Sequence, residues 1–466
     1  MNRGPHCQYD VAVLGGGSGG YAAARTAAAA GLKTALVDGA KELGGLCILR
    51  GCMPSKALLH AAEVLHLMRK AGHWGLRSTG IGFDWAQLMA WKQALIQQFA
   101  DYRRTELESG AFKLIRAQAQ FNDTHTLSLS TGETLTARHF VVATGSVVAA
   151  PMLPSLQNSG YLTSDTALSL ARLPRSLLVL GGGAVAVELA QFLARFDVQV
   201  TLVQRSRHIL SGLDEDLASE LETVFRREGI TLFTQTKLTE AGQEGGLKRI
   251  AFEQAGQIVR LAAEEILFAQ GRFPDTAHLR LDQAGVFTEH GRILTNTEMQ
   301  TTAHHIYAAG DCTGPHEIVH LAIQQGEIAA HNIAHPTKKR SMDYRLITQI
   351  VFTEPQVATV GLSEKEAQAH KIPYQAARYP FADHGKSIIM DTLDGFVKLL
   401  AHPATGEILG GGIVGPIGGE LIHEIIAAMH KQMTVRELAA MPHYHPTLAE
   451  IWTYPAEELA AKIPPK

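Results

Sequence analysis

A glycine-rich turn between two short apolar runs is the feature that most limits how this chain can fold. The first run is Tyr9–Leu14, the turn reads Gly-Gly-Gly-Ser-Gly-Gly at 15–20, and the second run, Thr34–Val37, ends at Asp38. An Ala-rich stretch separates the turn from the second run. This order predicts a strand, a tight turn, a helix and a second strand followed by an acid, which is the fingerprint of a dinucleotide-binding fold.

The glycines of this turn have separate physical roles. Gly15 permits the tight turn, Gly17 lets the backbone approach a pyrophosphate, and Gly20 lets the helix pack closely on the strand. The N-terminus of the helix then faces the anion. Asp38 can accept a hydrogen bond from a ribose hydroxyl, and its presence argues against the alternative of a structural turn without a ligand.

The same pattern recurs downstream. An apolar run ends at Leu180, Gly181 and Gly183 follow, and Ala186 occupies the third small position. A helix-like stretch then leads to another apolar run at 198–203. Two fingerprints, each between a strand and a helix, are much more specific than one. They predict an α/β chain with two doubly wound, Rossmann-like dinucleotide-binding domains.

The residues after the second fingerprint bear on which nicotinamide nucleotide binds. An acid at the end of the next strand would favour NAD through its ribose diol, but this position is Gln204, followed by Arg205 and Arg207. Arginine can accommodate a 2′-phosphate. The sequence therefore favours NADP(H). NAD(H) stays possible, because both arginines could also be solvated loop charges.

Two of the four cysteines, Cys47 and Cys52, lie close together in the stretch Gly-Gly-Leu-Cys-Ile-Leu-Arg-Gly-Cys-Met-Pro-Ser-Lys at 44–56. Across this spacing in a regular helix, Cα atoms lie about 8 Å apart, whereas a disulfide needs less than ~7 Å. A bridge thus requires a local departure from helix, for which Gly51 and Pro54 are suited. So short a loop gains little stability from a bridge, which favours a redox role. Metal binding, which lacks nearby ligands at zinc-like spacing, and structural thiols are the alternatives.

The chain resembles the flavoprotein disulfide reductase family, which includes dihydrolipoamide dehydrogenase, glutathione reductase and mercuric reductase. The resemblance covers nearly the whole chain. Its motifs are the two fingerprints, the Cys-x4-Cys stretch, Ala-Thr-Gly-Ser at 143–146, Gly-Arg-x-Pro at 271–274, Ala-Gly-Asp at 309–311 and His-Pro-Thr at 445–447. It implies FAD as a cofactor, with Cys52 facing the flavin as the charge-transfer thiolate and Cys47 attacking the substrate disulfide.

The resemblance assigns further residues to the flavin. Lys56 would lie near the flavin N5 edge, paired with Glu188, although an ordinary surface pair is the alternative. Asp311 would hydrogen-bond the FAD. The remaining positions with an implied cofactor contact are Gly45, Thr144, Gly145, Gly271 and Arg272.

A proton shuttle is expected near the C-terminus. A histidine titrates near neutrality and can carry the thiol proton, and a carboxylate can hold its other ring nitrogen. His445 and Glu450 could form such a pair if the chain turns after Pro446. His443 competes, but the match to His-Pro-Thr favours His445. In the family this pair serves the cysteines of the partner subunit, so the resemblance implies a homodimer.

The order of motifs and the family resemblance together predict four domain ranges. They are an FAD-binding domain at 1–150, an NAD(P)-binding domain at 151–274, a return to the FAD domain at 275–343 and an α+β dimerisation domain at 344–466.

Composition limits the remaining possibilities. The formal net charge is −3, and the chain has neither a long apolar run nor a signal peptide, so we expect a cytoplasmic protein without nucleic-acid or membrane partners. We expect no metal site. We expect no chemical role for Cys7 and Cys312. The alternative for Cys312 is a metal site formed with His316 and His320.

The expected function is NAD(P)H:disulfide oxidoreduction of the dihydrolipoamide dehydrogenase type. One alternative is an NADPH-dependent reductase of glutathione-like disulfides or of mercuric and other metal ions. No cysteine follows Cys312, so the C-terminal cysteine pair of mercuric reductase is missing. Another alternative is a non-catalytic flavin-binding subunit of a larger complex.

Overall fold

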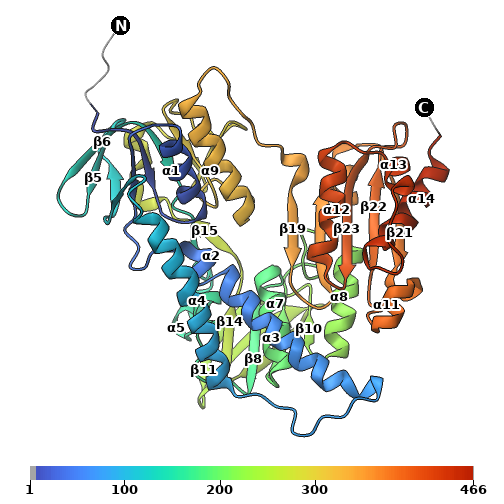
Figure 1. The fold of residues 1–466 in the computed structure, drawn as a ribbon. Helices are drawn as coiled ribbons and strands as arrows, with labels where there is room; N and C mark the ends of the chain where they lie inside the picture. The colour runs from blue at the N-terminus through green and yellow to red at the C-terminus, as the bar shows by residue number, and fades with distance from the viewer. Residues whose placement is uncertain (1–6, 465–466) are drawn as a thin grey trace. The chain divides into compact units, whose positions relative to one another are not determined.

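A computed structural model describes residues 7–464, which fold into two compact units. The first unit contains the chain up to Ser55 together with 87–149 and 271–343, and the second contains 56–86, 150–270 and the chain from Tyr344 onward. Each unit is described by itself below. Figure 1 labels the elements along the chain. The four sequence-based domain ranges are a finer division than these two units and stay a prediction.

The first unit is built on a mainly parallel sheet in the order β3-β2-β1-β6-β5-β4, with β18 also paired to β6. Its strands are β1 (Tyr9–Leu14), β2 (Thr34–Val37), β3 (Lys113–Ile115), β4 (Ala119–Phe121), β5 (Thr126–Leu129), β6 (Thr134–Val142) and β18 (Ile306–Ala308). β4, β5 and β6 pair antiparallel, and the other pairs are parallel. Smaller strands are β7 (Ser146–Val148), β15 (Arg272–Pro274), β16 (Thr288–Glu289) and β17 (Arg292–Ile293).

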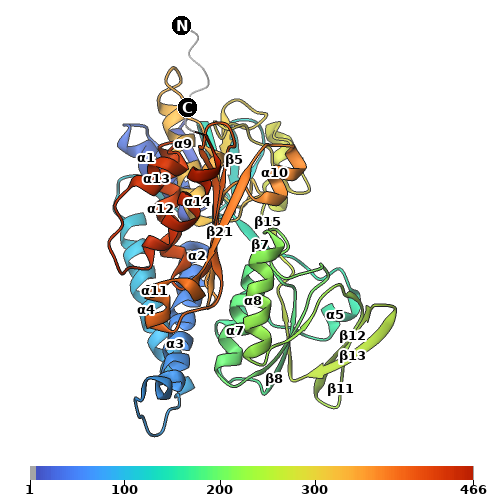
Figure 2. The ribbon, with the colours of Figure 1, turned by 90° about the vertical axis from the view of Figure 1, so that its right-hand side faces the viewer.

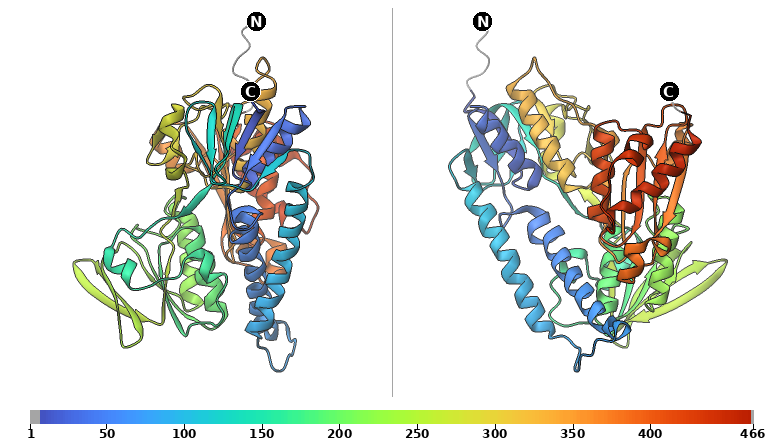
Figure 3. Two further views of the ribbon diagram at one scale, coloured as in Figure 1. Left: turned by 90° about the vertical axis from the view of Figure 1, so that its left-hand side faces the viewer. Right: turned by 45° about the vertical axis from the view of Figure 1, so that its right-hand side comes forward.

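Two helices pack tightly on each other in this unit. They are α1 (Ser18–Ala29) and α9 (Val319–Ala334), which lie side by side in Figure 3. A Cβ at position 326 would lie 2.2 Å from the carbonyl oxygen of Gly19, so only glycine allows this approach. The short α2 (Gly45–Leu49) also belongs here, while α3 (Cys52–Lys70) and α4 (Trp85–Leu107) each extend from one unit into the other.

The second unit holds a four-stranded parallel sheet in the order β10-β9-β8-β14. Its strands are β8 (Ser176–Leu180), β9 (Gln199–Val203), β10 (Thr231–Phe233) and β14 (Glu265–Phe268). Figure 2 shows α7 (Ala184–Arg195) and α8 (Glu215–Arg227) on one side of it, and an antiparallel sheet of β11 (Lys237–Glu244), β12 (Leu247–Gln254) and β13 (Gln257–Ala263) on the other. Two short helices, α5 (Pro154–Asn158) and α6 (Ser164–Ala167), precede β8.

A five-stranded antiparallel sheet forms the C-terminal part of the second unit, in the order β19-β20-β23-β22-β21. Its strands are β19 (Thr348–Val351), β20 (Gln356–Gly361), β21 (Gln375–Pro380), β22 (Phe396–Ala401) and β23 (Ile408–Gly415). The helices of this part are α10 (Glu364–His370), α11 (Gly385–Met390), α12 (Gly418–His430), α13 (Val435–Ala440) and α14 (Thr453–Lys462). α12 and α14 pack against the sheet around the fully buried Trp452. The expected α/β class with a separate α+β part is confirmed.

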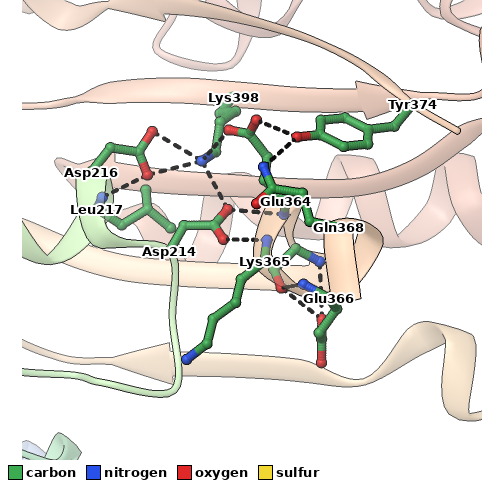
Figure 4. Close-up of polar contacts among 10 residues, drawn as sticks. Asp214, Asp216, Leu217, Glu364, Lys365, Glu366, Gln368, Tyr374 and Lys398 are labelled. Carbon is green, nitrogen blue, oxygen red and sulfur yellow. Dashed lines mark hydrogen bonds and ion pairs between the residues drawn. The ribbon is translucent and has the colours of Figure 1, made fainter. Parts of the chain in front are cut away.

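A buried charge cluster joins elements that are far apart in the sequence of the second unit (Figure 4). The ammonium group of Lys398 on β22 lies 2.8 Å from Asp214, 2.8 Å from Asp216 and 3.0 Å from Glu364. Lys398 is only 3% exposed. Asp214 also accepts hydrogen bonds from the backbone N–H groups of Glu364 and Lys365. The cluster therefore fixes the start of α8 against α10 and β22.

Within residues 7–464 no helix has the length and apolar character needed to cross a membrane.

Candidate active site

The two cysteines lie at an interruption between two helices. α2 ends at Leu49, Arg50 leaves the helical region at φ −144° and ψ 8°, and α3 begins at Cys52. The thiols of Cys47 and Cys52 thereby come into hydrogen-bonding contact. The departure from regular helix that a redox pair requires is confirmed, but Pro54 is not part of it. Pro54 lies in the first turn of α3, where a missing N–H costs nothing.

Gly51 leaves little room for any other residue at this interruption. A Cβ at position 51 would lie 3.1 Å from the carbonyl oxygen of Leu46 and 3.3 Å from the Cα of Cys47. Behind the pair, the hydroxyl of Ser55 donates to the carbonyl oxygen of Cys52 at 3.1 Å. Both cysteines are half-buried thiols in the structure.

The attacking role expected of Cys47 requires a base. The pKa of its thiol lies above the ordinary value, because Cys52 hydrogen-bonds with it and because it is largely buried, while the charge of Arg103 acts in the opposite direction. Since the thiolate is the nucleophile, a proton acceptor must assist.

The first glycine turn has the geometry of a pyrophosphate site. Gly15 has φ +102°, and a Cβ at position 20 would lie 1.8 Å from the carbonyl oxygen of Gly15. α1 begins after Gly17 without a side-chain cap and without an acid in its first turn, so its positive end is open to an anion. The buried Asp38 accepts the N–H of Gly16 at 2.9 Å and keeps lone pairs for a ribose hydroxyl.

The loop after β6 lies beside this turn. A Cβ on Gly15 would lie 3.2 Å from the Cα of Thr144, and the buried hydroxyl of Thr144 has no hydrogen-bond partner among the described residues. A polar ligand at the end of the sheet would satisfy it. Gly145, with φ +74°, continues the loop and accepts the N–H of Asp275 at 3.0 Å.

Ser146 then connects the other predicted positions. Its hydroxyl donates to Asp311 at 2.6 Å and accepts from Arg272 at 2.8 Å. Gly271 has φ +114° and accepts the N–H of Ala149 at 3.2 Å. Gly45, at the start of α2, lies against the first glycine turn, since its Cβ would be 2.7 Å from the Cα of Gly17. The residues expected to hold the first dinucleotide are thus in the first unit, except Lys56, which belongs to the second unit.

The second glycine turn repeats this geometry in the second unit. Gly181 has φ +123°, α7 begins after Gly183 without a side-chain cap, and Ala186 is fully buried. Gln204 replaces the acid here and lies against the loop, because a Cβ on Gly182 would be 2.9 Å from its amide carbon.

The two arginines expected to recognise the 2′-phosphate of NADP(H) are held by fewer contacts than Gln204. Arg205 is exposed, and its backbone N–H donates to the side-chain oxygen of Gln204 at 3.1 Å. Arg207 lies 3.3 Å from Glu215 in an exposed pair, which is a weak interaction. Their role in nucleotide selection stays a prediction.

Lys56 and Glu188 form a positioned pair. The ammonium nitrogen of Lys56 lies 2.9 Å from the nearly buried Glu188. Glu188 also accepts the backbone N–H of Phe352 at 2.9 Å, and the ammonium lies 4.4 Å from the centroid of the Phe352 ring. Three interactions hold Lys56 and Glu188 in place, whereas an ordinary surface pair would have the ion pair alone.

The two C-terminal histidines differ in exposure. His445 Nδ1 lies 3.0 Å from Glu450 Oε2, and its side chain is 76% exposed. The side chain of His443 is 7% exposed and points to Glu424 on α12, with Nε2 2.5 Å from Oε1. Of these two histidines, it is His445 that combines a carboxylate on one ring nitrogen with an exposed ring, as a proton shuttle to another subunit requires.

Sequence reasoning missed a third histidine at this carboxylate. His384 is fully buried, with Nε2 3.4 Å from Glu450 Oε1 and Nδ1 2.9 Å from the Ser387 hydroxyl. Burial lowers the pKa of His384 and Glu450 acts in the opposite direction, so the imidazole is neutral near pH 7. Among 22 histidines no sequence signal distinguishes it, since the contact exists only after folding.

Cys312 has a packing role. Its sulfur lies 3.4 Å from the carbonyl oxygen of Val142 and 3.3 Å from that of Ala309, and burial raises the pKa of its thiol to about 12. Within the described part of the chain no group of three or more His, Cys, Asp or Glu side chains is suited to a metal ion. Cys7 lies at the start of the described residues.

Comparison with known proteins settles the family. A model described as "Pyridine nucleotide-disulphide oxidoreductase" matches residues 9–326, and its dimerisation domain matches residues 347–456. The chain belongs to the pyridine nucleotide-disulphide oxidoreductase family. Membership implies FAD and a pyridine nucleotide, and the two glycine turns, with Asp38, Thr144 and Asp311, fit such ligands. When bound, FAD supplies two-electron transfer between the nicotinamide and the cysteine pair.

The relatives within this oxidoreductase family differ in substrate. A dihydrolipoyl dehydrogenase of Chlamydia trachomatis is 34% identical over 449 residues, covering 95% of each chain. A mercuric reductase of Staphylococcus aureus is 33% identical over 444 residues, covering 95% of this chain and 81% of the relative. The HOCl-induced flavoprotein disulfide reductase RclA of Escherichia coli has a TM-score of 0.86 at 25% identity, covering 96% of this chain and 99% of RclA. The chain is thus an enzyme of this class whose substrate the comparisons leave open.

Proposed function

We propose that the enzyme is an FAD-dependent NAD(P)H:disulfide oxidoreductase that exchanges dithiols and disulfides of the dihydrolipoamide type through Cys47 and Cys52. The observation that carries this proposal is the interruption between α2 and α3, which brings both thiols into contact. The exposed His445, held by Glu450, supports it, because organic thiols need a proton donor and acceptor.

The exchange of thiols and disulfide balances with the two cysteines and one histidine. The Cys47 thiolate attacks one sulfur of the substrate disulfide, the substrate S–S bond breaks, and the leaving thiolate takes a proton from His445 of the partner subunit. The Cys52 thiolate then attacks the sulfur of Cys47, which releases the second substrate thiolate and leaves a Cys47–Cys52 disulfide. Bound FAD would supply the two-electron transfer from the nicotinamide nucleotide that restores the dithiol, and the cysteines would act in the reverse order when a dithiol is oxidised.

This proposal includes a homodimer, because the shuttle serves the cysteines of another copy. The matched dimerisation domain supports it. A monomeric form should bind FAD yet reduce disulfides poorly. Size-exclusion chromatography with light scattering, run alongside the reductase assay, tests this requirement, and full activity in a monomer would contradict it.

NADP(H) is the proposed nicotinamide nucleotide. Gln204 occupies the position of the acid that would hold the ribose diol, and Arg205 and Arg207 follow it at the end of β9. The ratio of kcat/KM for NADPH and NADH tests this choice. A preference for NADH of about tenfold or more, about 1.4 kcal/mol, would reject it.

A metal-ion reductase is the second candidate, favoured by the mercuric reductase relative. The missing C-terminal cysteine pair and the retained His445 argue for an organic substrate. A panel of lipoamide, glutathione disulfide and Hg(II), assayed with the FAD-loaded enzyme and both nucleotides, separates the candidates. Turnover of Hg(II) alone would replace the proposal, and no turnover at all would favour a non-catalytic flavin-binding subunit.

A further inference from the structure

Arg103 on α4 is a partly buried cation that has no ion pair among the described residues. Its Nε and Nη1 atoms are buried and have no hydrogen-bond partner among the described residues. Its guanidinium carbon lies 4.3 Å from the centroid of the Tyr21 ring, which covers one face of the group but satisfies no N–H. Buried unpaired donors of a charged group cost free energy, so such a group needs an explanation beyond packing.

The carboxylates around Arg103 are used by other partners. On the same helix, Glu106 accepts the hydroxyl of Tyr21 at 2.9 Å, and Asp101 pairs with Arg104 at 2.7 Å. The nearest cation on α1, Arg25, is paired with Glu327 of α9. Arg103 therefore differs from both neighbouring arginines in lacking a carboxylate.

A series of contacts connects Arg103 to the helix that carries the attacking thiol. Tyr21 donates its backbone N–H to Gly17 at 2.8 Å, and Gly17 is the residue against which Gly45, the start of α2, packs. α2 carries Cys47, and the charge of Arg103 acts on the pKa of Cys47. Cys52 and burial outweigh this effect and keep the pKa of the Cys47 thiol above its ordinary value, so the resting thiol does not supply the anion that Arg103 lacks.

We propose that Arg103 is the anion-recognition residue of the disulfide site and selects disulfides and thiols that carry a carboxylate close to the sulfur that Cys47 attacks. This inference rests on the proposed disulfide reductase function. Nε and Nη1 lack partners and lie on different edges of the planar guanidinium, and each of these edges can bind a carboxylate with Nη2 as the second donor. A carboxylate bound on either edge would satisfy one of the two free donors and would position the substrate sulfur for Cys47.

Three small disulfides of matched length test the inference with the FAD-loaded enzyme. They are 3,3′-dithiodipropionate, which is anionic, bis(2-hydroxyethyl) disulfide, which is neutral, and cystamine, which is cationic. In the wild type we expect kcat/KM for the anionic disulfide to exceed that for the neutral one by about tenfold or more, as hydrogen bonds to a charged group allow. Arg103→Gln should reduce this ratio to within about twofold, and Arg103→Lys should restore part of it.

Arg104→Gln is the matched control, because Arg104 is adjacent, exposed and already paired with Asp101. It should keep the wild-type ratio. An unchanged ratio in Arg103→Gln would overturn the inference and leave the proposed function intact. Equal loss on all three disulfides together with loss of FAD, measured by absorbance after desalting, would also overturn it, since Arg103 would then serve the flavin. A wild-type enzyme that binds FAD but reduces none of the three would overturn the proposed function and the inference together.

Discussion

His384 Nε2 lies 3.4 Å from Glu450 Oε1, whereas His445 contacts the other carboxylate oxygen, Oε2. One buried carboxylate therefore lies between a buried neutral histidine and an exposed one. Nδ1 of the imidazole lies 2.9 Å from the Ser387 hydroxyl, while Nε2 has no hydrogen-bond partner among the described residues and has Glu450 as its nearby carboxylate. His384 would then be a positioning residue, holding Glu450 so that its other oxygen faces His445.

We predict that His384→Leu lowers kcat for disulfide reduction about tenfold, because one misplaced hydrogen-bond donor costs about 1–2 kcal/mol. His384→Asn, which keeps an N–H donor, should recover most of the loss. Electron transfer from the nucleotide to ferricyanide needs no proton shuttle and should stay unchanged in both variants. If ferricyanide reduction falls in parallel with disulfide reduction, the role of His384 is structural only.

Gly51→Ala should impair the cysteine pair without removing FAD. The new methyl group would lie 3.1 Å from the carbonyl oxygen of Leu46 and would displace the segment that carries Cys47. Overpacking costs about 1–3 kcal/mol, so we expect disulfide reduction to fall about tenfold. Gly72→Ala is the control, because no atom lies within 4 Å of a Cβ there. Wild-type rates in Gly51→Ala would show that the interruption tolerates a side chain.

Lys398→Met should destabilise the protein by about 3 kcal/mol, because it leaves the carboxylates of the buried cluster without their cation. The exposed Lys462→Met, which breaks a surface pair with Glu458, is the control and should change stability by less than about 1 kcal/mol. Urea unfolding at pH 7 measures both. Equal stability of the two variants would contradict the role of the cluster.

The same cluster predicts a pH dependence. Burial acts to raise the pKa of Asp214, but hydrogen bonds from Lys398 and from the backbone of Lys365 outweigh it and hold the pKa below its ordinary value. A lowered folded-state pKa contributes stability that is present above about pH 4 and is lost as the pH falls through the folded value. Unfolding free energies of the wild type should therefore fall below about pH 4, with a weaker fall in Lys398→Met. Parallel pH curves for the two proteins would contradict this.

Gln204→Glu should shift nucleotide preference toward NADH. The new carboxylate would lie against Gly182, where it can accept from a ribose diol and would repel a 2′-phosphate. We expect the ratio of kcat/KM for NADPH to that for NADH to fall about tenfold or more, with lipoamide or another turned-over disulfide as acceptor. A ratio that does not change would mean that Gln204 does not contact this part of the nucleotide.

The sequence predicted the elements whose signals are local. The glycine turns at Gly15 and Gly181 lie between the expected strands and helices because tight turns and close backbone approach demand glycine there. The break at Gly51 was predictable for the same reason. The choice of His445 over His443 came from a motif, and the opposite exposures of the two side chains give it a physical reason.

Other contacts depend on packing between distant segments. His384 meets Glu450, and Lys398 meets Asp214, only after α11 and β22 have folded beside residues far away in the sequence. Arg103 carries no motif either. Its importance becomes visible only when its Nε and Nη1 atoms are seen to lack partners while Glu106 and Asp101 of the same helix have other partners.

The most direct test of the redox centre is a thiol count. The FAD-loaded enzyme, oxidised and then reduced anaerobically with NADPH or NADH, is denatured and titrated with a thiol reagent. We predict a gain of two thiols per chain on reduction in the wild type and none in Cys47→Ser or Cys52→Ser, with Cys7 and Cys312 reacting equally before and after reduction. No gain in the wild type, or a gain that survives in Cys52→Ser, would contradict the account.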